Sequence, residues 1–291
     1  MDIMKKQTIY ALMIIAMVTW GMAWSSAKIV NYYLPYDELV FLRFFIGFIT
    51  MLPFLFFHPI NIKIINKYTW LNIIIVSILF FLYNQCFFMG TDYGQAGKGG
   101  VFVTTTNPII TFVIMSLIVK RIKSMQLIAI MIGGMGGLMT LNVIESGIAH
   151  LTFSGSIYFI FCSFIWGVMT ILMAKGQKHI DSISYILLCY LVTTVISIPF
   201  VDSRFIFDEK LLDWNFILHF IIVCNAMSIG TSIYMYASER LGPIQVSTFI
   251  FSLPFIAMSS AYLVLDEPIG LNVIIGGLLS ILSIYMINKE K

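Results

Sequence analysis

Two amide side chains lie inside long apolar stretches of this sequence, where a polar group needs partners of its own. Asn84 and Asn107 occupy such positions, and Thr105 lies two residues before Asn107. An amide surrounded by hydrocarbon requires several hydrogen-bond partners, and a bound molecule can supply some of them. A threonine more often bonds to its own or a neighbouring helix, so a structural role for Thr105 stays open.

Aromatic side chains form the apolar part of the candidate site. Tyr83 and Phe87 are four residues apart, which places them on one face of a helix. For the tryptophans and tyrosines, placement at the lipid-water interface is the alternative. An aromatic pocket with a few amides suits a small, partly apolar, zwitterionic metabolite. The residues predicted to bind substrate are Trp20, Tyr83, Asn84, Phe87, Thr105, Asn107, Trp166 and Tyr234.

Charged side chains are scarce inside the apolar stretches. Arg43 lies a few residues into one of them, and we expect it to extend outward and pair with Asp37 or Glu38. Recognition of a ligand's charge is the alternative for Arg43. No carboxylate falls at the middle of a stretch, so a proton relay built on a buried acid is not predicted. His219 does fall inside one, and core packing is favoured over proton transfer there.

The four cysteines also fall in apolar stretches, without CxxC spacing or a nearby histidine cluster. We interpret them as small buried side chains. The sequence contains neither a GxxxxGK[ST] phosphate loop nor an HExxH zinc motif. We therefore expect no metal site, no cofactor and no enzyme activity.

The composition identifies the elements that must position these residues. Hydrophobic residues make up 59% of the chain and charged residues 11%, against roughly 45 to 50% and about 25% in soluble domains. A helix that crosses a bilayer needs about 20 apolar residues, so we predict an all-α polytopic membrane protein. The first window is long enough to be a retained span rather than a secretion signal. The ten windows of this kind are 8–27, 39–57, 68–91, 99–119, 124–144, 151–174, 182–201, 214–238, 241–265 and 268–288.

The ten windows divide into two similar halves, 1–146 and 147–291, each with five windows. Five is an odd number, so the second half must cross the membrane in the opposite sense, as the inverted repeats of many transporters do. The evidence for the duplication is an offset of 146 residues shared by scarce landmarks. The pairs are Trp20 with Trp166, Gly21 with Gly167, Pro53 with Pro199 and Pro108 with Pro254.

Lysine and arginine predict the orientation, because they accumulate on the cytoplasmic side of membrane proteins. With the N-terminus inside, twelve of the seventeen basic residues fall in cytoplasmic segments. We therefore expect a protein of the cell membrane with both termini in the cytoplasm.

Pro108 and Pro254 lie near the centres of two charge-free windows. A proline in the middle of a helix frees the carbonyl four residues earlier, so we expect kinks at both that open a cavity between the halves. A tolerated bend, satisfied by neighbouring serine or threonine, is the alternative.

These patterns resemble the drug/metabolite transporter superfamily, in its ten-span EamA-type branch. The resemblance rests on the Trp-Gly pair of each half, on a small-residue turn before each proline helix, and on the sequence LDEPIGLNVIIGG at 265–277. The first half departs from this last pattern, because VKRIKSMQLIAIMIGG at 119–134 has basic residues in place of the acidic pair. That turn is predicted to be cytoplasmic, so the preference for positive charge inside accounts for the departure.

The resemblance implies a secondary transporter that moves small organic metabolites by alternating access, with export of amino acids or related compounds as the expected activity. A multidrug or organic-cation exporter is the runner-up, and a membrane-embedded enzyme or an accessory subunit represents the other classes. The expected partners are a small-molecule substrate and the lipid bilayer, without nucleic acid, and the chain is expected to be a monomer or a homodimer. Gly133 and Gly137 have GxxxG spacing, mirrored by Gly276 and Gly277, so the fifth and tenth windows are expected to be scaffold or dimer surface.

Overall fold

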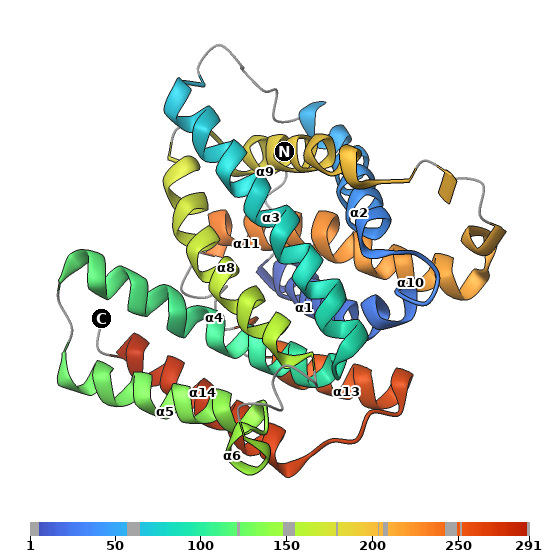
Figure 1. Ribbon diagram of the computed structural model, residues 1–291. Helices are drawn as coiled ribbons and strands as arrows, with labels where there is room; N and C mark the ends of the chain where they lie inside the picture. Colours follow the sequence, from blue (N-terminus) through green and yellow to red (C-terminus); the bar gives the residue numbers. More distant parts are fainter. Residues whose placement is uncertain are drawn as a thin grey trace.

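The chain forms a bundle of long helices (Figure 1). The computed structural model describes residues 6–56, 65–120, 123–147, 155–178, 180–202, 204–205, 209–241, 249–250 and 252–289. These residues are almost all helical, and none of them lies in a β-strand.

The helices follow the two halves of the sequence. Those of the first half are α1 (Lys6–Val30), α2 (Tyr36–Met51) with its extension η1 (Leu52–Phe56), α3 (Lys67–Tyr93), α4 (Ala96–Val119), α5 (Ser124–Thr140) and the short α6 (Val143–Ser146). Those of the second half are α8 (Ser156–Gly176), α9 (Ser182–Ser197) with η3 (Ile198–Phe200), η5 (Glu209–Leu212), α10 (Trp214–Asn225), η6 (Ala226–Gly230), α11 (Thr231–Leu241), α13 (Leu253–Leu265) and α14 (Leu271–Lys289).

Seven helical segments of the described chain are long and apolar enough to cross a membrane, and α5, α13 and α14 are shorter apolar helices. Each of these ten segments overlaps one of the ten apolar windows of the sequence, although α13 covers only the second half of the window 241–265. The prediction of an all-α polytopic membrane protein is therefore confirmed.

Capping side chains place several helix starts. Asn66 accepts a hydrogen bond from the Thr69 amide at the start of α3, at 2.8 Å. Asp181 accepts one from the Ser184 amide at the start of α9, at 2.9 Å. Such caps satisfy amides that have no partner within the first turn. They explain why these helices begin at a polar residue on the edge of an apolar window.

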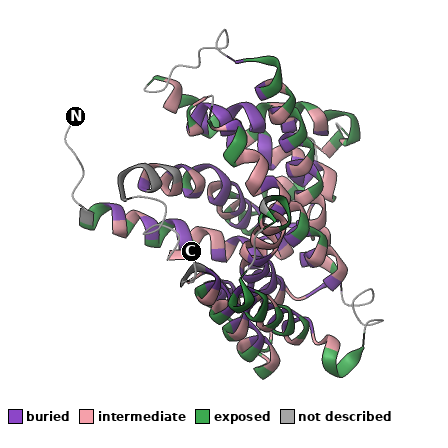
Figure 2. Ribbon diagram, turned by 90° about the vertical axis from the view of Figure 1, so that its left-hand side faces the viewer, coloured by how far each residue is buried: buried purple, intermediate pink, exposed green. Residues whose placement is uncertain are grey.

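Large apolar side chains cover the outer faces of the bundle. Leu117 is 72% exposed and Leu263 is 77% exposed. Figure 2 shows buried residues concentrated where helices meet and exposed residues on the outward faces. A surface of this kind suits hydrocarbon, and helices satisfy their own backbone groups there.

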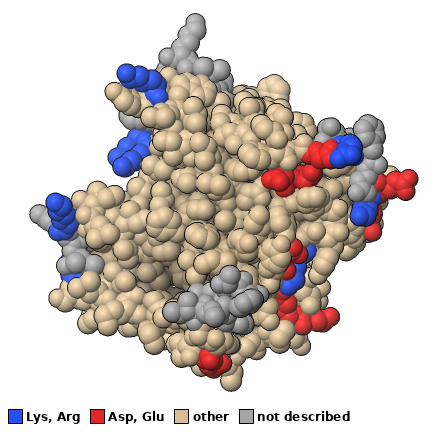
Figure 3. Space-filling model, viewed as in Figure 1, with Lys and Arg blue, Asp and Glu red and all other residues tan. Residues whose placement is uncertain are grey.

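Charged side chains lie at the margins of the molecule. In Figure 3, a broad field of uncharged residues separates lysine and arginine at the left margin from a mixed, partly acidic group at the right margin. The left margin is where α3 begins and α4 ends in the same view (Figure 1). The uncharged field between the margins is what a membrane-spanning bundle requires.

The two halves contact each other in a reciprocal way. Gly21 of α1 packs so closely on Ile256 of α13 that no side chain fits between them, and Gly167 of α8 packs in the same way on Ile110 of α4. Ile110 and Ile256 are themselves 146 residues apart. Exchange of equivalent contacts between two copies is the signature of two-fold symmetry. These reciprocal contacts are those that a pseudo-two-fold axis between the two halves would produce.

Glycines of α5 and α14 allow these two helices of the same chain to pack closely. Gly136 and Gly276 lie against each other's backbone with no room for a Cβ atom. Ser283 of α14 donates a hydrogen bond to the Ala129 carbonyl of α5 at 2.6 Å. Small residues that allow such close approach are a common device of membrane helices. This supports the expected scaffold role and assigns these glycines to contact within one chain.

The two prolines have different structural positions. Pro108 lies inside the continuous helix α4, as expected. Pro254 lies in the first turn of α13, after Ser252 at the N-cap. A proline costs nothing at that position, because its missing N–H would have no partner there. The prediction of a mid-helix kink at Pro254 is therefore wrong; the helix begins there instead. The turn expected before it, at 242–248, lies outside the described residues.

Candidate functional site

Arg43 belongs to α2, and its side chain lies in the interior of the bundle, in contact with α3. It is only 6% exposed, and its Nη1 donates a hydrogen bond to Asn84 Oδ1 at 2.6 Å. The Asn84 Nδ2 donates to the Phe80 carbonyl at 2.8 Å, so the amide is held with its oxygen toward the guanidinium. The expectation that Arg43 extends outward is wrong.

Both carboxylates proposed as partners of Arg43 have other partners. Asp37 Oδ1 accepts a hydrogen bond from Gln85 Nε2 at 2.5 Å. Glu38 Oε1 accepts one from the Asp202 amide at 3.2 Å. The prediction that Arg43 forms an ion pair with one of these acids is therefore wrong. Glu38 is nevertheless 5% exposed and its Oε2 has no partner.

Aromatic rings surround the guanidinium. The Arg43 Cζ lies 4.9 Å from the centre of the Phe87 ring and 5.8 Å from that of Phe88. A guanidinium over an aromatic face is attracted by the ring quadrupole, which offsets part of the cost of burial. Phe87 was predicted from the sequence as a site residue; its contact with Arg43 was not.

The aromatic contacts continue from Phe87 to the second half. Tyr83 stacks near Phe87, with ring centres 6.3 Å apart, and meets Trp166 at 5.0 Å. Trp24 of α1 packs edge-on against Phe87 at 4.8 Å. The structure thus brings together five of the residues named from the sequence: Arg43, Asn84, Phe87, Tyr83 and Trp166. We call these five residues the arginine cluster.

Trp20 and Tyr234 form a second group. Their ring centres are 5.4 Å apart. The Trp20 indole donates from Nε1 to the Ala226 carbonyl at 2.5 Å, and the Tyr190 hydroxyl donates to the Met227 carbonyl at 3.0 Å. Both carbonyls belong to η6, a single π-helical turn. Such turns recur at functional sites, and no residue pattern in the sequence pointed to this one.

The two remaining polar candidates differ in their bonding. Thr105 is 1% exposed and donates to the Val101 carbonyl of its own helix at 2.8 Å, which is the structural role left open above. The side-chain oxygen of Asn107 is buried and has no partner among the described residues. A buried acceptor without a donor is costly, so Asn107 keeps its candidacy as a group that a ligand satisfies.

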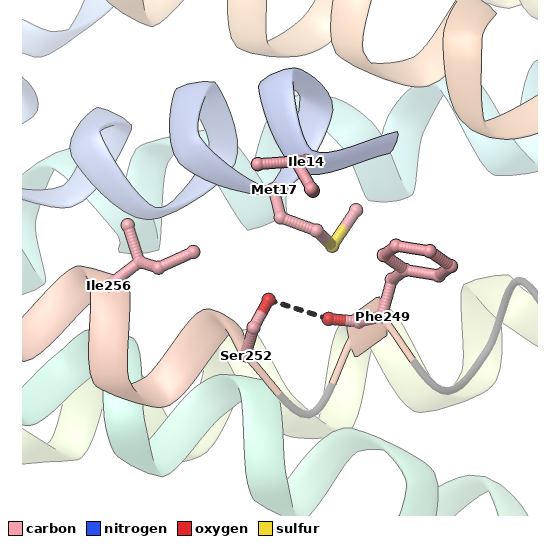
Figure 4. A pocket seen from close by; sticks show the side chains of 5 residues that line it. All are labelled: Ile14, Met17, Phe249, Ser252 and Ile256. Carbon is pink, nitrogen blue, oxygen red and sulfur yellow. Dashed lines mark hydrogen bonds between the residues drawn. The ribbon is translucent and has the colours of Figure 1, made fainter. Parts of the chain in front are cut away.

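A cavity of about 370 Å³ opens beside α1, lined by Ile14, Met17, Phe249, Ser252 and Ile256. In Figure 4 the side chains of α1 and α13 face each other across it, and the Ser252 hydroxyl turns back to the Phe249 carbonyl at 2.7 Å. The walls therefore present apolar surface. Ile256 is also the residue that packs on Gly21, so the cavity adjoins the contact between the halves.

The C-terminal end of α1 is closed by an ion pair that sequence reasoning missed. Lys28 Nζ lies 3.2 Å from Glu267 Oε1 and donates to the Gly94 carbonyl at 2.7 Å. The Glu267 carboxylate also accepts from the Ala96 and Gly97 amides, each at 2.9 Å. It caps α4 from the turn before α14, because Gln95 provides no side-chain cap. The acidic pair of that turn was its sequence signal.

His219 packs in the core. It is 9% exposed, and its Nδ1 lies 3.0 Å from the Ser26 hydroxyl of α1. Cys162, Cys189 and Cys224 are buried, and Cys86 is partly buried; all four are free. Among the described residues, no three His, Cys, Asp or Glu side chains gather as metal ligands would.

Comparison with known families decides the class of the protein. The EamA-like transporter family matches residues 7–142 and again residues 153–289. The chain belongs to this family. The double match agrees with the reciprocal contacts between the halves, and it confirms the resemblance to the drug/metabolite transporter superfamily.

Of two curated relatives of this EamA-like chain, one is named as a transporter. The chain is 23% identical to the uncharacterized transporter YoaV of Bacillus subtilis (strain 168), over 92% of both chains. It is 33% identical to the WAT1-related protein At5g64700 of Arabidopsis thaliana, over 46% of this chain and 38% of that protein. A solved crystal structure matches its fold with a TM-score of 0.60 at 13% identity, over 98% of this chain and 99% of the other.

Proposed function

We propose that this protein is a secondary transporter that moves small organic metabolites, amino acids or related compounds, out of the cell by alternating access. The observation that carries the proposal is the reciprocal packing of Gly21 on Ile256 and Gly167 on Ile110. Two equivalent halves in contact across a pseudo-two-fold axis can exchange their conformations, which opens a central site to one side and then to the other.

Two positions along α1 support this mechanism. Lys28, in the closed ion pair, and Ile14, at the cavity, are 14 residues apart in the helix, which corresponds to about 21 Å. The charged contact thus closes the C-terminal end of α1, while the cavity adjoins its N-terminal half. With the N-terminus in the cytoplasm, the proposed mechanism assigns this arrangement to a state open toward the cytoplasm.

The charge distribution supports the proposed orientation in the cell membrane. Lysine and arginine gather at the margin where α3 begins and α4 ends (Figure 3). With this margin in the cytoplasm, the arrangement follows the preference for positive charge inside.

Counterflow in proteoliposomes tests the function. Vesicles preloaded with unlabelled amino acids, nucleosides or organic cations are diluted into the labelled solute, with and without an imposed pH gradient. We expect saturable exchange of one solute class that does not need the gradient, because no buried acid relay was identified. Absence of exchange for every solute, from protein shown to be folded, would instead favour an accessory subunit.

An organic-cation exporter is the less favourable alternative. The buried guanidinium of Arg43 repels cations, and among the described residues no carboxylate lies within ion-pair distance of it. The same counterflow panel separates the two functions, since a cation exporter would exchange the labelled cation and leave amino acids untouched.

A further inference from the structure

We infer that the arginine cluster is a binding site for the carboxylate of the transported molecule, so that the substrate is a small organic monoanion or zwitterion with an apolar body. This inference rests on the proposed transport function and names the substrate class for it. Its central group is the guanidinium of Arg43.

The charge of Arg43 has no counter-ion among the residues that the structure describes. Within the described part of the chain, no carboxylate lies within ion-pair distance of the guanidinium. The ionisable groups that interact with it are Cys224, Tyr83 and Tyr190, which are neutral at physiological pH. A buried cation without a counter-ion is strongly unfavourable. The fold nevertheless has a buried cation at this position, where a neutral side chain would pack at a lower cost in free energy.

The guanidinium has donors to spare. Its one hydrogen bond to a described residue is that from Nη1 to Asn84 Oδ1, and Nε is buried without a partner. Asn84 is a neutral acceptor, locked by its bond to the Phe80 carbonyl. It therefore orients Arg43 without neutralising it. A planar fork of N–H donors matches the two oxygens of a carboxylate.

The surroundings favour a single negative charge over a phosphate. A phosphate dianion would need a second cation, and among the described residues no lysine, histidine or other arginine interacts with Arg43. The neighbouring rings of Tyr83, Phe87 and Trp166 offer apolar surface instead. Tyr83 and Trp166 are only partly buried, so the rings provide a contact face for the body of the substrate.

The cluster lies where the two halves meet. Arg43 and Asn84 belong to α2 and α3, whereas Cys224 lies in the last turn of α10, shortly before η6. Tyr190, which interacts with Arg43, donates its hydroxyl to η6. A rearrangement between the halves changes this junction, which gives a substrate held there access to either side.

Ligand-induced thermal stabilisation of the purified full chain tests the site. The probes are 3-phenylpropionate and L-phenylalanine, each paired with its carboxamide, which removes the negative charge and keeps the apolar body. We expect the carboxylates to raise the melting temperature of the wild type by a few degrees, since a ligand that binds the native state stabilises it, and the amides to leave it unchanged.

Two variants in the cluster and one outside it sharpen the test. Arg43→Gln should weaken carboxylate affinity more than about 30-fold, the effect of removing one partner of a buried charge pair, without lowering the melting temperature of the unliganded protein. Asn84→Asp should raise that melting temperature and abolish the shift, because it supplies the missing carboxylate from within. Arg204→Gln is the matched control, since Arg204 is exposed and paired with Asp202; it should keep the full shift.

The inference is overturned if no carboxylate stabilises the wild type, if amides act as well as carboxylates, or if both cluster variants keep the shift. Counterflow of the same probes separates this result from the proposed function. Binding without exchange would retain the site and reject transport. Exchange of uncharged solutes or cations, without carboxylate binding, would retain transport and reject the site.

Discussion

Lys28 Nζ lies 3.2 Å from Glu267 Oε1, and this pair joins α1 to the turn before α14 across 239 positions of sequence. The same carboxylate caps the first turn of α4 through the Ala96 and Gly97 amides. Three helices are therefore held at one end by a single side chain. Four predictions test particular side-chain contacts, and the first concerns Glu267.

Glu267→Gln removes the charge and preserves the shape of the side chain. We expect it to destabilise this end by about 1 to 3 kcal/mol, because hydrogen bonds to a charged group are lost, and to open the side that Glu267 seals. Labelling of Met258→Cys, a residue beside Glu267 in the same small cavity, by a membrane-impermeant maleimide should become faster. Glu209→Gln, at an exposed acid, is the control; equal labelling rates in both would show that Glu267 seals nothing.

Trp20→Phe removes the indole N–H that reaches the Ala226 carbonyl and keeps most of the ring contact with Tyr234. We expect transport to fall severalfold with normal expression, because the π-helical turn loses a buried hydrogen bond worth about 1 kcal/mol. Counterflow rates normalised to folded protein measure this. Trp214→Phe, at a tryptophan that is 74% exposed, should be neutral, and a Trp20 variant as active as that control would count against a role for η6.

Asn107→Ala removes a buried acceptor that has no partner. We expect unchanged or slightly higher thermal stability, since an unsatisfied polar atom is lost, together with lower transport. A variant that is at least as stable as the wild type but transports less would indicate that Asn107 serves transport rather than folding. Asn215→Ala, at an exposed asparagine, provides the comparison, and unchanged transport in Asn107→Ala would remove this residue from the site.

Gly21→Ala and Gly167→Ala each add a methyl group where Ile256 or Ile110 leaves no space. We expect each to lower stability by about 1 to 3 kcal/mol, the usual cost of overpacking. Gly134→Ala is the matched control, because its position opens onto free space; it should gain up to about 1 kcal/mol from higher helix propensity. Thermal unfolding of the three variants in one detergent gives the comparison, and a neutral Gly21→Ala would contradict the close packing.

The spans could be predicted from the sequence because hydrocarbon imposes a simple length and polarity rule on each helix. The 146-residue offset also anticipated which contacts are equivalent, since Trp20 and Trp166 each precede a glycine that packs near a proline helix. Hydrogen bonds between side chains of different helices could not be predicted. Arg43 was assigned to acids on its own helix, whereas Asn84, 41 positions away, is its partner.

The positions of helix ends and irregular turns also could not be predicted from the sequence. Pro254 looks like Pro108 in its apolar surroundings, yet one starts a helix and the other lies within one. Composition does not encode the helix boundary that distinguishes them. The capping role of Glu267 depends in the same way on the position of α4 relative to a turn 170 residues later.

The π-helical turn at Ala226–Gly230 sets the phase of everything that follows it in α11. A turn of this type holds one residue more than an α-helical turn, so α11 is rotated by about 100° relative to an uninterrupted helix. That rotation directs Tyr234 toward Trp20. Deleting one residue between 226 and 230 would convert the π-helical turn into a regular α-helical turn. The change of register by one position would rotate Tyr234 away from Trp20 and break the contact between the two rings.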